Sequence, residues 1–179
     1  RDFSSTQINL QGAFAATVKR LAAQIKDDDL AADGREDQPH VTVKFGLHTN
    51  TADEVRRVLR GQKRVYLKLG KVSLFEGNPD FDVVKVDVES DDLHRLNALL
   101  ASKLESTDTH PEYHAHVTLA YVKPGHGKKY VGACPLTGMQ TMANTVMFSS
   151  KDRRMIAIRL AKALMQKLRS EYLDSFADK

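Results

Sequence analysis

The chain has 179 residues, of which 41% are hydrophobic and 28% are charged, and this balance excludes a disordered protein. Its 27 basic and 23 acidic residues leave a net charge of +4, which is too small to indicate nucleic-acid binding by itself. The single cysteine, Cys134, excludes an internal disulfide, and no apolar run approaches the ~18 residues of a membrane span, so we expect a cytoplasmic protein without a membrane partner.

The first third of the chain is expected to alternate strands with helices. Apolar side chains recur at every second position in the strands and at every third or fourth position in the helices. Thr51, followed three positions later by Glu54, is typical of a capping box at a helix start. The predicted elements are a strand at 3–10, a helix at 11–26, a loop at 27–39, a strand at 40–47 and a helix at 51–59.

The rest of the chain carries more strands than helices. Strands are predicted at 64–75, 81–89, 114–122, 146–148 and 156–160, with a helix capped by Ser90 between the second and the third. The tail at 161–179 has an apolar residue at every fourth position, which predicts an amphipathic helix. Such a helix packs on its own domain or supports self-association with a second subunit.

This order of elements predicts an α+β fold with a mostly antiparallel sheet, because several neighbouring strands are joined by turns. Residues 1–160 are expected to form one domain built from two similar halves, and residues 161–179 to form the C-terminal helix. In each half, a helix precedes a strand that opens with the same four-residue pattern.

The repeated pattern is histidine, valine, threonine and an apolar residue, at His40–Val43 and again at His116–Leu119. Successive side chains of a strand point to opposite faces, so each histidine shares a face with its threonine while the apolar residues are buried. Two such strands, brought together by a duplicated architecture, would present two imidazoles and two hydroxyls to one cleft.

This set of groups suits phosphodiester chemistry. Near neutral pH one imidazole of His40 and His116 can accept a proton while the other donates one. The hydroxyls of Thr42 and Thr118 can donate hydrogen bonds to phosphate oxygens. No metal or cofactor is predicted, since no carboxylate cluster joins the histidines at ligand spacing. One His-x-Thr on a strand is usually structural, but two copies in matching places favour catalysis.

Four further residues are candidates for substrate binding, each with a structural alternative. Lys44 extends the face of the first motif and could hold a phosphate, or be an exposed strand lysine. His114 could tune the catalytic pair, or be solvated at a strand end. Phe75 and Tyr113 could stack on nucleobases, or cover the core. The loop at 125–130, GHGKKY, could close over an anionic substrate or be an exposed hairpin.

The stretches HVTVKFG and HVTLAYV resemble the paired motifs of the 2H phosphoesterase superfamily. This resemblance, which covers about residues 3–160, implies a bilobal fold with two mostly antiparallel sheets around a central cleft and flanking helices. It also implies metal-independent phosphodiester chemistry. His40 and His116 correspond to the paired histidines of the family, and Thr42 and Thr118 to its hydroxyl positions.

Longer stretches, FDVVKVDVESDDLHRLN and THPEYHAHVTLAYVKPGHGKKY among them, resemble the bacteriophage anti-CBASS branch. That branch implies cleavage of 3′–5′ bonds in cyclic oligonucleotides in the cytoplasm of an infected bacterium, with a ribose 2′-hydroxyl as nucleophile. Which imidazole is the base stays open. Two alternatives also stay open: action on 2′–5′ oligoadenylates or on RNA ends with a cyclic phosphate, and a non-catalytic nucleotide-binding module.

Overall fold

The computed structural model describes residues 1–161, so the predicted tail helix lies, after Ala161, outside the described residues. The elements are β1 (Ser4–Asn9), α1 (Gly12–Ala23), η1 (Asp27–Asp29), β2 (Leu30–Arg35), β3 (His40–Leu47), α2 (Ala52–Leu59), β4 (Val65–Phe75), β5 (Asp82–Glu89), α3 (Asp91–Lys103), β6 (His116–Val122), η2 (Lys128–Tyr130), β7 (Gln140–Ala143), β8 (Thr145–Ser149) and β9 (Met155–Arg159). Among the described helices, none has the length and apolar character needed to cross a membrane.

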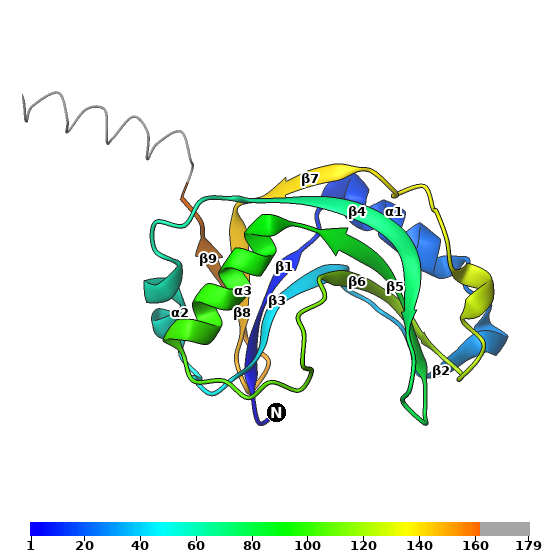
Figure 1. The fold of residues 1–179 in the computed structure, drawn as a ribbon, viewed down its shortest axis with the longest axis horizontal. Helices are drawn as coiled ribbons and strands as arrows, with labels where there is room; N and C mark the ends of the chain where they lie inside the picture. The colour runs from blue at the N-terminus through cyan, green and yellow to red at the C-terminus, as the bar shows by residue number, and fades with distance from the viewer. Residues whose placement is uncertain (162–179) are drawn as a thin grey trace, which may run out of the picture.

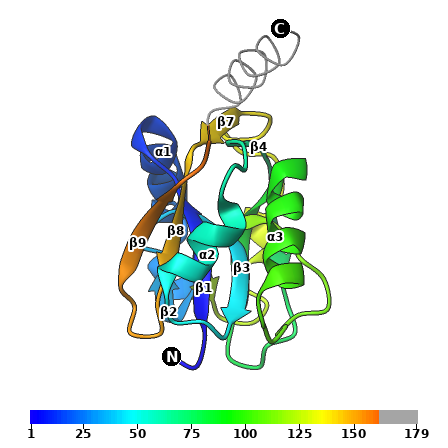
Figure 2. The same ribbon diagram turned by 90° about the vertical axis from the view of Figure 1, so that its left-hand side faces the viewer.

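The strands form one nine-stranded sheet in the order β7-β4-β5-β6-β3-β1-β8-β9, with β2 added alongside β6. Figure 1 shows this sheet bent into an arch, with α2 and α3 at one end and α1 at the other. The turned view in Figure 2 shows α2 and α3 beside each other, in agreement with their contacts. The predicted α+β class is confirmed, and the two expected sheets are continuous with each other.

The two halves of the sheet meet where β3 pairs with β6. Their antiparallel register sets Val41 opposite Val117, and both valines are fully buried. Val43 and Leu119, the other apolar positions of the two motifs, are also buried, as the alternation predicted. The helices cover the sheet with apolar side chains that the spacing predicted: Val18, Ala22, Leu93, Leu96 and Leu100.

Two local predictions were wrong, and one strand was not predicted. The stretch expected as a loop contains β2, whose sequence LAADGR has no alternation and which exists because β6 offers it hydrogen-bonding partners. Strand β7 was missed because QTMA is short and polar, and it pairs at the edge with β4. The capping box does not form: Thr51 accepts from the N–H of Asp53 at 3.2 Å, while the Glu54 carboxylate bonds the Thr49 hydroxyl instead.

Candidate active site

The two repeated motifs lie side by side at the centre of the sheet. Extending the Val41–Val117 register by one residue in each direction sets His40 opposite Thr118 and Thr42 opposite His116. All four side chains share the face opposite the buried valines. The two histidines are then diagonal neighbours, about 7–8 Å apart at the backbone, a separation that leaves room for one phosphate between the rings.

Both rings are held in the same way. Nδ1 of His40 lies 2.7 Å from the carbonyl oxygen of Gln38, and Nδ1 of His116 lies 2.6 Å from the carbonyl oxygen of His114. A carbonyl oxygen can only accept, so in each ring Nδ1 carries the proton and donates it. Nε2 is therefore the atom that each neutral ring can use as a base, or each imidazolium as an acid.

The surroundings of His116 favour its neutral form. Burial lowers its pKa and outweighs the carbonyl of His114, which raises it. The positive charges of Lys85 and His40 lower the pKa further, against an opposing effect of Asp87. The effect of His40 agrees with the strand register, which makes the two histidines diagonal neighbours.

Next to His116 lies a polar cluster that was not predicted from the sequence. Lys85 is only 6% exposed, and its ammonium donates to the Asp87 carboxylate at 2.7 Å and to the Ser73 hydroxyl at 2.6 Å. It also lies 4.3 Å from the ring centre of Phe75. A signal was present in the sequence: in the strand at 81–89, Lys85 and Asp87 occupy the face opposite Val84, Val86 and Val88.

Phe75, one of the predicted substrate contacts, lies directly against the second motif. Its ring meets that of His116 edge-on, with 4.9 Å between centres. Phe75 also borders a pocket of about 370 Å³, whose lining comes from β4, β5, α3 and the segment before β6 and includes Tyr113 and His114. A pocket of this size can hold a nucleobase next to the Phe75 ring. Stacking of a base on Phe75 stays a prediction.

The other predicted contacts have partners within the protein. Lys44 is buried and ion-paired with Asp108, in the segment between α3 and β6. Tyr113 donates its hydroxyl hydrogen to the Thr42 carbonyl at 2.7 Å, and burial raises its pKa. Both side chains hold the 104–115 segment on β3. His114 is exposed and contributes its carbonyl to the orientation of His116. Substrate contacts of these three side chains stay predictions.

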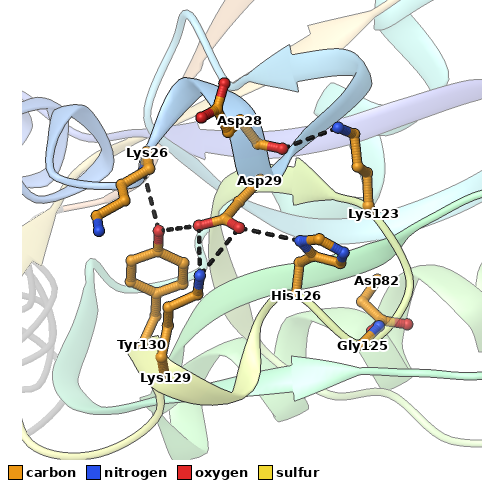
Figure 3. A network of polar contacts seen from close by, with 9 residues as sticks. All are labelled: Lys26, Asp28, Asp29, Asp82, Lys123, Gly125, His126, Lys129 and Tyr130. Atoms are coloured by element: carbon orange, nitrogen blue, oxygen red, sulfur yellow. Dashed lines mark hydrogen bonds and ion pairs between the residues drawn. The ribbon is translucent and has the colours of Figure 1, made fainter.

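The GHGKKY loop is fastened at the far end of β6 from His116 (Figure 3). The carboxylate of Asp29, which is 4% exposed, accepts from the Tyr130 hydroxyl at 2.5 Å and from His126 Nδ1 at 3.0 Å. The Lys129 ammonium lies 2.9 Å from the same carboxylate. Lys129 and His126 of the loop thus both have an anionic partner within the protein, which favours the structural alternative for this loop.

We expect Asp29→Asn to lower the Tm at pH 7, because Tyr130, Lys129 and His126 lose the anion that they share. Their hydrogen bonds lower the pKa of Asp29 far below its ordinary value of 3.8, so this stabilisation is complete above that value and is lost as the pH falls through the native pKa. Thermal unfolding from pH 7 down to pH 2 measures it. A Tm difference between variant and wild type that stays constant toward low pH would contradict this account.

The described residues contain no group of three or more histidine, cysteine or acidic side chains that could hold a metal ion. The arrangement offers these side-chain groups for chemistry: two Nε2 atoms, two threonine hydroxyls and a neighbouring buried ammonium. Two imidazoles on either side of one phosphate can remove a proton from an attacking oxygen and supply one to a leaving oxygen.

Comparison with known proteins agrees with this geometry. The model of the 2′-5′ RNA ligase superfamily matches residues 16–127, whereas no curated protein matches the sequence. Three solved structures have a similar fold. The protein TT0787 of Thermus thermophilus has a TM-score of 0.60 at 15% identity, and the match covers 89% of this chain and 95% of that one. Usb1 of Kluyveromyces marxianus with uridine monophosphate has a TM-score of 0.59 at 10% identity, and the match covers 89% of this chain and 98% of that one.

The third structure is E. coli LigT complexed with 3′-AMP, with a TM-score of 0.57 at 18% identity, over 89% of this chain and 95% of that one. At such identities the likeness concerns the fold alone. The family match is independent of it and spans both histidine motifs. The matched family, the paired motifs and the arched sheet agree, and the chain belongs to the 2′-5′ RNA ligase superfamily of 2H phosphoesterases.

Proposed function

We propose that this protein is a metal-independent phosphodiesterase that cleaves 3′–5′ bonds in cyclic di- and trinucleotides, and that it serves a bacteriophage in evading CBASS defence. The observation that carries the catalytic part is the matched pair of imidazoles, each held through Nδ1 by a carbonyl two residues upstream. Membership of a superfamily of phosphoesterases supports hydrolysis of a phosphoester bond. The cyclic substrate and the phage role rest on the resemblance of the longer sequence stretches.

In this reaction a ribose 2′-hydroxyl attacks the adjacent phosphorus, and a 2′,3′-cyclic phosphate forms as the 5′-oxygen leaves. One motif imidazole accepts the hydroxyl proton and the other protonates the leaving oxygen. Thr42 and Thr118 donate hydrogen bonds to the non-bridging oxygens, on which negative charge accumulates in the transition state. The pocket beside Phe75 would receive a base of the substrate.

A second candidate is action on 2′–5′ linked oligoadenylates or on RNA ends that bear a cyclic phosphate. It is favoured by the name of the matched family and by two fold neighbours that hold nucleoside monophosphates. Both candidates use the same imidazole pair, so the choice between them depends on which substrates fit between the rings and the pocket. A third reading, a non-catalytic nucleotide-binding module, predicts binding without turnover.

A panel of substrates in the presence of EDTA tests the proposal. We expect cleavage of a cyclic di- or trinucleotide, read by chromatography, with an undiminished rate after chelation because side chains alone transfer the protons. The panel includes a 2′–5′ dinucleotide and a linear RNA as alternatives. Faster turnover of either one would replace the cyclic substrate, and loss of activity with EDTA that returns on adding a divalent cation would refute the metal-independent scheme.

A further inference from the structure

The two halves of the site are related by their strand registers. In one half β1 pairs with β3, which sets Gln7 opposite Thr42 and Asn9 opposite His40. In the other half β5 pairs with β6, which sets Lys85 opposite Thr118 and Asp87 opposite His116. Each motif therefore has a neighbouring strand whose side chains occupy equivalent places on the same face of the sheet.

The residues in these equivalent places differ in charge. Beside the first motif is a neutral amide pair, in which Gln7 Nε2 donates to Asn9 Oδ1 at 2.7 Å. Beside the second motif is an ion pair at the same distance, formed by Lys85 and Asp87. Ser73 joins that ion pair by donating to the Asp87 carboxylate at 2.6 Å. The half that contains His116 thus carries a buried cation, and the half that contains His40 does not have one at this place.

The charges next to the two rings differ as well. The Glu36 carboxylate lies 3.9 Å from Nδ1 of His40, so an imidazolium there would face an anion. The ring of His116 has the apolar Phe75 ring against it instead, at 4.9 Å between centres. The charged and titratable groups around His116 are Lys85 and Asp87 on β5, His40 on β3, and His114 in the segment just before β6.

We propose that Lys85 is a positioning residue that keeps the His116 imidazole neutral, so that His116 is the general base and His40 the general acid. This assignment rests on the proposed function. The His116 Nε2 lone pair accepts the proton of the attacking 2′-hydroxyl as the bond between O2′ and phosphorus forms. The bond between phosphorus and O5′ breaks, and O5′ takes the proton that His40 Nε2 carries, which leaves the total charge unchanged.

A substrate whose leaving 5′-oxygen is replaced by sulfur tests the assignment, because a thiolate leaves without being protonated. With a cyclic 3′–5′ dinucleotide of this kind, we expect His40→Ala to recover at least about 10²-fold of the activity that it loses on the oxygen substrate, and His116→Ala to recover none. Recovery of His116→Ala instead, or of neither variant, overturns the assignment. Failure of the wild type to cleave either substrate counts against the proposed function rather than against the assignment.

The role of Lys85 is tested by two variants with opposite expected effects. Lys85→Met leaves the Asp87 carboxylate uncompensated beside His116, so the acid limb of the pH–rate profile should move up by about one pH unit. Asp87→Asn leaves the ammonium uncompensated and should move that limb down. Lys85→Arg keeps the positive charge, so the acid limb should lie at the same pH as in the wild type. Lys129→Met, which removes a lysine from a distant ion pair, is the matched control.

The same shifts are measurable without turnover. Nitrogen chemical shifts of the His116 ring follow its protonation in the free protein, and we expect a neutral ring at pH 7 whose pKa rises in Lys85→Met and falls in Asp87→Asn. A merely structural role of the cluster would lower the Tm of both variants and move neither titration. A protonated His116 at pH 7, or shifts of the same sign in both variants, overturns the proposal even if no substrate has been found.

Discussion

Replacing His116 with alanine is expected to lower kcat for phosphodiester cleavage by about 10²–10⁴-fold, the contribution of one general acid or base. The same loss is expected for His40→Ala, since each ring transfers one of the two protons. Nδ1 of each ring bonds a neighbouring carbonyl in its own half of the site, so removing one ring leaves the other in place. The Tm of both variants should stay close to that of the wild type, because neither ring belongs to the buried core.

The pH dependence distinguishes loss of catalysis from loss of structure. The wild type should show a bell-shaped profile, and each alanine variant should lose one limb of it. The double variant should be hardly slower than either single variant, because the two rings act in one step. His110→Ala is the matched control: it removes an exposed histidine outside both motifs and should leave kcat unchanged. A motif variant that cleaves as fast as the wild type would exclude the acid–base scheme.

The second large effect concerns stability. Gly46→Ala is expected to lower the free energy of unfolding by about 2–5 kcal/mol, the sum of an overpacked contact and a left-handed backbone. Gly46 has a φ of 79°, and a Cβ there would overlap the carbonyl oxygen of Thr107. The backbones of these two residues are joined by a 2.9 Å hydrogen bond. Because the 104–115 segment leads into the second motif, its displacement should also reduce activity.

A second glycine separates the two causes. Gly34 has a similar φ of 63°, but nothing lies within 4 Å of the place where its Cβ would be. Gly34→Ala should therefore cost only about 1–2 kcal/mol, the conformational part alone. Urea unfolding of both variants measures the difference. Equal destabilisation by the two substitutions would mean that the contact with Thr107 contributes nothing.

The candidate site was predictable to the extent that it follows from strand alternation. The spacing within each motif is enough to set His40 with Thr42, and His116 with Thr118, on one face, and the burial of the intervening valines agrees. The cluster around Lys85 was not predicted, although its residues share a face in the sequence pattern. A lysine on a strand is usually exposed, and its burial depends on Phe75 and Ser73 of another strand.

The sequence by itself determined the α+β class, most of the strands and helices, and the identity of the four motif residues, because these follow from local periodicity and repetition. Only the tertiary structure decided that the two halves form one continuous sheet, that β2 and β7 are strands, and that the GHGKKY loop is bound to Asp29. The physical reason is the same in each case. A hydrogen bond or an ion pair between segments far apart in the chain leaves no periodic signal in either of them.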